Sequence, residues 1–277
     1  MNNKIKITSF LTITALSSLL VIGCNSLGEI ALEKPSNANQ STQLTVSAAA
    51  SLKDVIEELK PLYQQQHPET EIIYNFGSSG SLQQQIEQGA PVDIFISAAS
   101  KQMNALEKKQ LLLTETRRDL LKNQMVLITL ETNAKNNAKF DNFDDLTSQE
   151  IETIALGEPE SVPAGKYARE ILASFQIADK VTPKTVYGKD VRQVLNYVAT
   201  GNAEAGIVYR TDVQIADNVK IIATAPENTH SPVVYPIAVI KDSQHPEAAK
   251  DLIEFLTTRE AKEVFEENGF ITMNNEQ

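Results

Sequence analysis

Short apolar runs alternate along this chain with segments in which apolar residues recur every three or four positions. The first run, at 44–47, is followed by Leu52, Val55, Ile56 and Leu59, which have helical spacing. Such alternation is typical of βαβ units, so we predict an α/β fold with mixed, mostly parallel sheets flanked by helices. Further strands are expected at 71–74, 93–97, 125–130, 153–156, 205–209, 219–224 and 233–240.

Four places where a strand or loop gives way to a predicted helix are candidate anion sites: 48–51, 77–81, 162–165 and 189–191. The first three carry small or uncharged residues, whereas the last includes Lys189 and Asp190 before Val191. The first N–H groups of a helix have no partner within it, and the helix dipole places positive charge there. Such ends bind anions, and hydroxyl groups add further donors. The sequence therefore predicts an oxyanion site built without cationic side chains.

The amino terminus has the pattern of a secretory signal. Lys4 and Lys6 precede an apolar run at 7–22, and Gly23 is followed by Cys24, the single cysteine of the chain. This arrangement resembles the lipobox of a bacterial lipoprotein, which implies cleavage after residue 23 and lipidation of Cys24. A buried structural thiol is the alternative. We predict a signal peptide at 1–23 and a flexible tether at 24–43, rich in Ser, Asn and Pro.

The chain is acidic, with a formal net charge of −11. Loss of Lys4 and Lys6 with the signal would make it more negative by two. No basic run and only 6% aromatic residues argue against nucleic-acid binding. Because long-range attraction cannot draw an anion to such a protein, local dipoles would have to hold it.

Several strings together resemble the molybdate-binding proteins of bacterial ABC uptake transporters, in order and spacing from about Leu44 to Phe270. The resemblance implies a type II periplasmic-binding-protein fold, with lobe 1 at 44–123 plus 232–277, lobe 2 at 124–231 and a ligand cleft between them. The strings are AAASL (48–52), FGSSGSL (76–82), GAPVDIFISA (89–98), GEPESVPAGKYA (157–168), DVR (190–192), GIVY (206–209) and YPIAVI (235–240).

The resemblance also implies a set of ligand contacts. Ser51 and Ser79 match residues that donate through hydroxyl groups, and Ala164 and Val191 match residues that donate through backbone N–H groups. Tyr209 matches a phenolic donor. Molybdenum would enter only as the bound oxyanion, and no catalytic residue or cofactor is implied. Gly80 stands where some relatives have a third hydroxyl residue.

Each of these residues also has a simpler interpretation when taken alone. Ser51 and Asp54 have the spacing of a capping box, and Ser79 fits a turn. Ala164, Val191 and Tyr209 fit ordinary core packing.

Other charged residues are less suited to the ligand. We expect Asp190 to point to solvent or to Arg192, because a carboxylate would repel an anion, and Lys166 to lie on a solvated helix face. His67, His230 and His245 have no second ligand at helical spacing, which argues against a metal site.

The implied function is a monomeric, lipid-anchored receptor outside the cytoplasmic membrane. It would capture molybdate, and tungstate with it, and deliver the ion to an ABC permease by hinge closure near 123–125 and 231–233. A receptor for another oxyanion such as sulfate, a serine hydrolase and a structural lipoprotein are the alternatives. The hydrolase is disfavoured because GSSGS (77–81) lacks the last glycine of the nucleophile elbow and no histidine lies in any of the four junctions.

Overall fold

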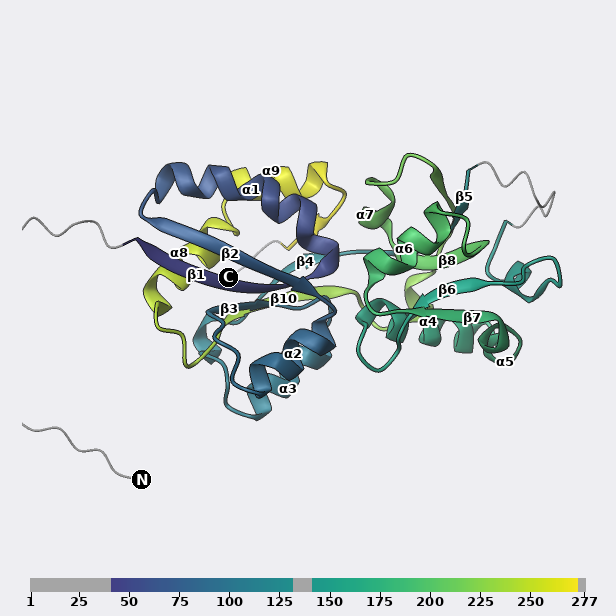
Figure 1. Ribbon diagram of the computed structural model, residues 1–277, viewed down its shortest axis with the longest axis horizontal. Helices are drawn as coiled ribbons and strands as arrows, with labels where there is room; N and C mark the ends of the chain where they lie inside the picture. Colours follow the sequence, from purple (N-terminus) through teal and green to yellow (C-terminus); the bar gives the residue numbers. More distant parts are fainter. Residues whose placement is uncertain (1–40, 132–140, 274–277) are drawn as a thin grey trace, which may run out of the picture. The chain divides into compact units, whose positions relative to one another are not determined.

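The computed structural model of this protein describes residues 41–131 and 141–273 (Figure 1). The predicted signal peptide, Cys24 and nearly all of the predicted tether lie outside the described residues. Within the described residues, helices and strands alternate along the chain and form two separate sheets, each flanked by helices.

Six strands of the described residues form the first sheet, in the order β11-β4-β10-β3-β1-β2. β1 pairs in parallel with β2 and β3, whereas β10 pairs antiparallel with β3 and β4, and β11 antiparallel with β4. The bounds are β1 (Thr42–Ala49), β2 (Thr70–Gly77), β3 (Ile94–Ile96), β4 (Arg118–Lys122), β10 (Val234–Val239) and β11 (Ile271–Thr272).

Five strands of the described residues form the second sheet, in the order β7-β6-β8-β5-β9. β6 pairs in parallel with β7 and β8, and β5 pairs antiparallel with β8 and β9. The bounds are β5 (Met125–Leu130), β6 (Ile154–Gly157), β7 (Thr185–Gly188), β8 (Ala205–Tyr209) and β9 (Val219–Thr224).

Helices cover both sheets (Figure 1). Beside the first sheet, α1 contacts α9, and α2 contacts α3. Beside the second sheet, α4 and α6 both pack on β6 and β8. The bounds are α1 (Lys53–Gln66), α2 (Ser79–Glu87), α3 (Ser100–Lys108), α4 (Pro163–Ser174), α5 (Ala178–Val181), α6 (Val191–Ala199), α7 (Arg210–Val213), α8 (Pro246–Phe255) and α9 (Arg259–Glu267), with short 3₁₀ turns at η1 (Ala50–Leu52), η2 (Thr114–Thr116), η3 (Asp144–Thr147), η4 (Thr182–Lys184) and η5 (Glu227–Thr229).

The helices bury the apolar stripe that the sequence pattern predicts. In α6, Val191, Val194, Leu195 and Val198 recur at helical spacing and are all buried. The strands between the helices are nearly continuous in apolar character; every residue of β8, for example, is buried. Burial on both faces is expected for a sheet with helices on both sides.

The sheets are mixed, as predicted, but the prediction that most strand pairs are parallel is wrong. Antiparallel pairs connect β4, β10 and β11 in the first sheet and β5, β8 and β9 in the second. A parallel pair needs a crossover connection, usually a helix, and β4 leads into β5 of the other sheet through only Asn123 and Gln124. The apolar pattern identifies strands but not these direct connections.

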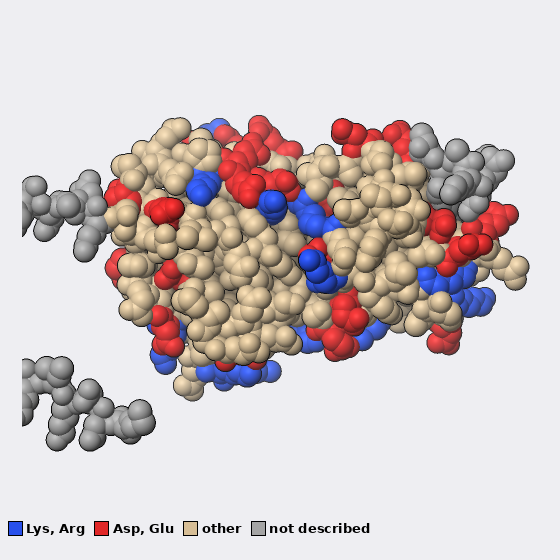
Figure 2. All heavy atoms as spheres, in the orientation of Figure 1, with Lys and Arg blue, Asp and Glu red and all other residues tan. Residues whose placement is uncertain are grey.

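The surface is acidic where helices of the first sheet lie. On the face in Figure 2, acidic side chains gather over α1 and α9, whose outer positions carry Asp54, Glu57, Glu58, Glu263 and Glu266. This concentration of carboxylates fits the negative net charge and agrees with the argument against a nucleic-acid partner.

The beginning of α4 approaches the end of β6 very closely. A Cβ atom added at Gly165 would lie 2.0 Å from the carbonyl oxygen of Gly157. Backbone cannot yield as a flexible side chain can, so glycine is required at this contact. The approach fixes the N-terminus of α4 beside the carboxyl end of the second sheet.

Gly165→Ala should therefore lower the free energy of unfolding by about 2 kcal/mol or more, because the helix must move away from β6. Urea unfolding measures this loss. Gly77→Ala is the matched control, since its Cβ would meet only the Leu82 side chain at 3.4 Å. Its stability should change by less than about 0.5 kcal/mol. Equal stability of the two variants would contradict the close-approach argument.

Candidate functional site

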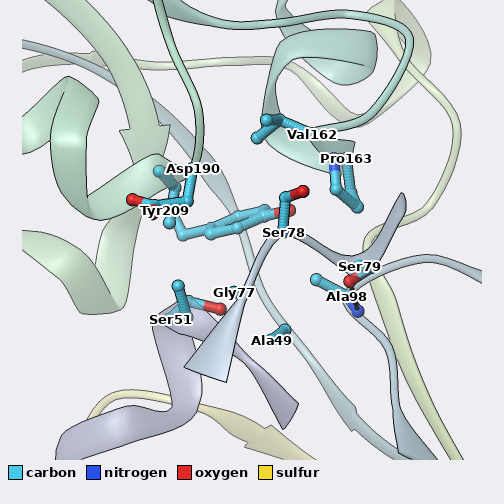
Figure 3. Close-up of a pocket in the computed structure, with 12 residues that line it drawn as sticks. Ala49, Ser51, Gly77, Ser78, Ser79, Ala98, Val162, Pro163, Asp190 and Tyr209 are labelled. Atoms are coloured by element: carbon cyan, nitrogen blue, oxygen red, sulfur yellow. Dashed lines mark hydrogen bonds between the residues drawn. The ribbon is translucent and has the colours of Figure 1, made fainter. Parts of the chain in front are cut away.

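A small pocket lies where η1 and the N-termini of α2, α4 and α6 come together (Figure 3). Its cavity volume is about 10 Å³, close to the smallest that holds one water molecule. The elements around it belong to both sheets. Its walls are formed by Ala49, Ala50, Ser51, Gly77, Ser78, Ser79, Ala98, Val162, Pro163, Asp190, Val191 and Tyr209.

Ser51 lies in the 3₁₀ turn between β1 and α1, and it does not cap the helix as the sequence spacing suggests. The cap position of α1 is Leu52, which makes no side-chain cap hydrogen bond. The Ser51 hydroxyl instead lies 2.9 Å from the hydroxyl of Tyr235, and both residues are buried. The extra 3₁₀ turn displaces the helix start by one residue and leaves Ser51 at the pocket wall.

Ser79 is the first residue of α2, and the neighbouring Ser78 caps that helix by accepting from the Ser81 N–H at 3.2 Å. Ser79 Oγ accepts a hydrogen bond from the Ala98 N–H at 2.9 Å. Among the described residues no acceptor lies within reach of its own hydroxyl hydrogen or of its backbone N–H. Both can therefore be donated to a ligand in the pocket.

The first turns of α4 and α6 supply backbone donors. Within the part of the chain that the structure describes, the N–H groups of Ala164 and Val191 have no acceptor, as expected at helix starts. Val191 lines the pocket. Ala164 does not form its wall, although the preceding residues Val162 and Pro163 do, and its side chain is fully buried.

Tyr209 ends β8 and its ring lies across the pocket (Figure 3). Its side chain is 1% exposed, and its hydroxyl has no hydrogen-bond partner among the described residues. Burial raises the pKa of this phenol well above its usual value, and the charge of Asp212 acts in the same direction. Tyr209 therefore remains protonated and presents an unused donor inside the protein.

The charged residues beside the pocket are paired differently from the prediction. Asp190 lines the pocket and caps α6, since its carboxylate accepts from the Gln193 N–H at 2.9 Å. It remains partly exposed and does not pair with Arg192, because a helix start offers the carboxylate a closer donor. Lys166 is partly buried and pairs with Glu170, so it does not lie on a freely solvated face as predicted.

Arg192 connects the two sheets at one side of the pocket. From α6 it donates to the carbonyl oxygen of Ser51 at 3.1 Å and pairs with Asp54 of α1 at 2.6 Å. Its Nε lies 3.0 Å from Asp212, which is fully buried. Sequence reasoning did not assign this role to Arg192, although it directly follows Val191 in the DVR string.

A second connection between the sheets involves only backbone. The N–H of Gly80 in α2 donates to the carbonyl oxygen of Ser161, just before α4, at 2.9 Å. A Cβ atom at position 80 would lie 2.4 Å from the same oxygen. The absence of a side chain at Gly80 is therefore what permits this contact.

The pocket thus offers hydroxyl and N–H donors and is lined by neither Lys, Arg nor His. Buried donors of this kind match a small anion with several acceptor oxygens. No described group of His, Cys, Asp or Glu side chains could hold a metal ion. The fold and the pocket define a protein that binds a small solute between two α/β sheets.

Comparison with known proteins agrees with this class. The family of bacterial extracellular solute-binding proteins matches residues 44–271, and the chain belongs to that family. Its relatives include YvgL of Bacillus subtilis (strain 168), a lipoprotein assigned to the substrate-binding components of ABC transporters. The two sequences are 43% identical over 252 residues, covering 91% of this chain and 93% of the relative.

Two further relatives carry names that state a ligand. The molybdate-binding protein ModA of Haemophilus influenzae is 37% identical over 230 residues, which cover 83% of this chain and 90% of the relative. A solved structure, the substrate-binding domain assigned to a molybdenum ABC transporter of Clostridium difficile, is 44% identical. It covers 84% of this chain and all of that one, with a TM-score of 0.66. The predicted fold class of periplasmic binding proteins is confirmed.

The described residues also bear on the membrane. In residues 41–131 and 141–273 no helix has the length and apolar character needed to cross a bilayer.

Asp212 generates a prediction about pH. Burial raises its pKa from 3.8 to about 6, although Arg192 and the Tyr209 N–H partly oppose the rise. Below pH 3.8 the carboxyl is neutral in both states. As pH rises through about 6, the unfolded chain releases the proton more readily, so this group lowers stability.

Asp212→Asn should remove this loss of stability at rising pH, because asparagine does not titrate. The variant's free energy of unfolding relative to the parent should increase by about 3 kcal/mol between about pH 4 and pH 7. Urea unfolding at several pH values measures the difference. A difference that stays constant across this range would contradict the role assigned to Asp212.

Proposed function

We propose that this protein is the receptor of an ABC importer for molybdate and, with it, tungstate. The observation that carries the proposal is the unpartnered hydroxyl of Tyr209, buried in a pocket that also presents Ser51 and Ser79. A buried donor without a partner costs about 1–3 kcal/mol. A bound oxyanion would remove this cost, and the similarity to molybdate-binding proteins identifies the oxyanion.

The proposed contacts are those predicted from the sequence. Ser51, Ser79 and Tyr209 would donate through hydroxyl groups, and Ala164 and Val191 through backbone N–H groups. These donors come from different elements and surround the ion, whose four oxygens all accept hydrogen bonds. Each bond to a charged acceptor contributes about 1.5–3 kcal/mol, which offsets the loss of the ion's water.

Binding would be coupled to closure of two lobes, 44–123 with 232–277 and 124–231. Ser51 and Ser79 belong to the first and Ala164, Val191 and Tyr209 to the second, so a bound ion would bridge them. The Gly80–Ser161 hydrogen bond and the Arg192–Asp54 ion pair would form in the closed state. The segments near 123–125 and 231–233 would act as the hinge, and opening onto the permease would release the ion.

The location and partners follow from the same proposal. Cleavage after residue 23 would leave Cys24 as a lipidated amino terminus, which anchors the protein to the outer face of the cytoplasmic membrane. The protein would act as a monomer and deliver its ligand to a membrane permease. It would perform no catalysis, since the pocket wall holds no histidine and its one carboxylate, Asp190, accepts from the Gln193 N–H at the start of α6.

Ligand-induced stabilisation is the first test. Molybdate at a hundred times its dissociation constant should stabilise residues 41–277 by about 2.7 kcal/mol, which thermal unfolding detects as a higher Tm. Tungstate should act similarly, and sulfate and phosphate at matched ionic strength much less. Equal stabilisation by sulfate would overturn the assignment of molybdate, and no stabilisation by any of the four would overturn the receptor.

Single donors can be tested in the same assay. Ser79→Ala and Tyr209→Phe should each weaken molybdate binding about tenfold or more by calorimetry, because each removes one hydrogen bond to a charged acceptor. The Tm without ligand should change little for Tyr209→Phe, whose hydroxyl has no partner to lose. Ser81→Ala, in the same helix as Ser79 but outside the pocket wall, is the control and should bind normally.

Closure has its own test at Gly80. Gly80→Ala should weaken molybdate binding at least tenfold, because the added methyl group would meet the Ser161 carbonyl before the lobes close. The Tm without ligand should fall by much less than the Tm with ligand. Unchanged affinity would show that the Gly80–Ser161 contact plays no part in the bound state.

A further inference from the structure

We infer that Tyr235 is a positioning residue that turns the Ser51 hydroxyl into a donor toward the pocket and thereby disfavours anions that carry a proton. This inference rests on the proposed function. Tyr235 lies in β10, is fully buried and does not line the pocket. It would act on the ligand only through Ser51, whose hydroxyl lies 2.9 Å away.

The orientation of the network begins at Asn123, in the connection between β4 and β5. Its side-chain oxygen accepts from the Gln124 N–H at 2.8 Å, so the amide cannot be reversed without placing two donors against each other. The amide nitrogen then donates to the hydroxyl of Thr211 at 2.8 Å and, more weakly, to that of Tyr235 at 3.4 Å. The backbone N–H of Gln124 thus fixes the orientation of the Asn123 amide and, through it, the direction of the other hydrogen bonds in this network.

The Tyr235 hydroxyl must then donate to Ser51. Within the described residues, Ser51 Oγ is the only acceptor in reach of the Tyr235 hydroxyl hydrogen. If Ser51 donated instead, the phenolic hydrogen would be buried without a partner, which is unfavourable. Burial also raises the pKa of Tyr235 far above its usual value, so the phenol keeps its proton.

The consequence is that Ser51 uses one of its two lone pairs to accept from Tyr235, and its own hydrogen stays available for a ligand. Ser79 is in the same state, because it accepts from the Ala98 N–H. The two serine hydroxyls each accept one hydrogen bond from the protein, which favours donation of their hydrogens toward the pocket. Serines held in this way favour a fully deprotonated oxyanion and oppose acceptance of the proton of hydrogen phosphate by Ser51 and Ser79.

The test is a double-mutant cycle on Tyr235→Phe and Ser51→Ala, with molybdate binding measured by calorimetry on residues 41–277. Tyr235→Phe should weaken binding about fivefold and Ser51→Ala about tenfold or more. The double variant should bind no more than about twofold more weakly than Ser51→Ala alone. Tyr235→Phe keeps the ring that packs edge-on against Tyr209, so a general packing defect is not expected.

A second readout distinguishes positioning from packing. At about pH 8, molybdate and hydrogen phosphate are both dianions, but only hydrogen phosphate carries a proton. Tyr235→Phe should lower the preference for molybdate over phosphate at least about threefold, because Ser51 loses the bond that orients it and turns more easily to accept from the phosphate. Tyr209→Phe is the matched control; it removes a donor and should weaken both ions while keeping that preference.

Asn123→Asp provides an independent route should Tyr235→Phe fail to fold. Its second carboxylate oxygen would accept from Tyr235 and draw the phenolic hydrogen away from Ser51, with every ring in place. The preference for molybdate should again fall. Additive effects in the cycle, or an unchanged preference in the variants, would overturn the role of Tyr235. Failure of the unmodified protein to bind any oxyanion would instead overturn the proposed function.

Discussion

The central constraint on this protein is the cost of keeping hydrogen-bond donors unpaired in a place that water barely reaches. The Tyr209 hydroxyl, the Ser79 hydrogen and the first N–H groups of α4 and α6 all lack acceptors within the described residues. Each would be more stable with a partner. The rest of the structure keeps these groups close together, and under the proposed function a ligand with many acceptor atoms would pair with them.

The fold meets this constraint by using the N–H groups at helix N-termini in preference to charged side chains. Parallel strands direct their carboxyl ends to one edge of a sheet, and the helices that follow begin there. Two sheets built in this way place η1 and α2 on one side of the pocket and α4 and α6 on the other. Arg192, the cation nearest to Ser51 in the hydrogen-bond network, is engaged by Asp54 and Asp212. In the proposed site, selectivity would depend on the direction of donors and very little on net charge.

Much of this could be predicted from the sequence, because the repeating apolar pattern marks each long helix and the bounds of β5, β8 and β9. The short strands β4, β7 and β11 could not. β7, for example, exposes Val186 and Tyr187 and has no buried stripe to detect. The pocket brings together four of the five predicted residues in its wall, and Ala164 lies in the adjoining first turn of α4. Asn123, Arg192 and Tyr235 were missed because their partners lie more than 80 residues away in sequence.

The hydrogen bond between Gly80 and Ser161 has a further consequence for sequence variation. Ser161 contributes only its carbonyl oxygen, and every amino acid has one, so position 161 can change without altering the bond. Gly80 contributes an N–H, yet any side chain there would collide with the same oxygen. The two ends of one bond are therefore under unequal constraint. With the backbone as it lies in this protein, substitutions should be tolerated at 161, whereas a side chain at 80 would require the two segments to move apart.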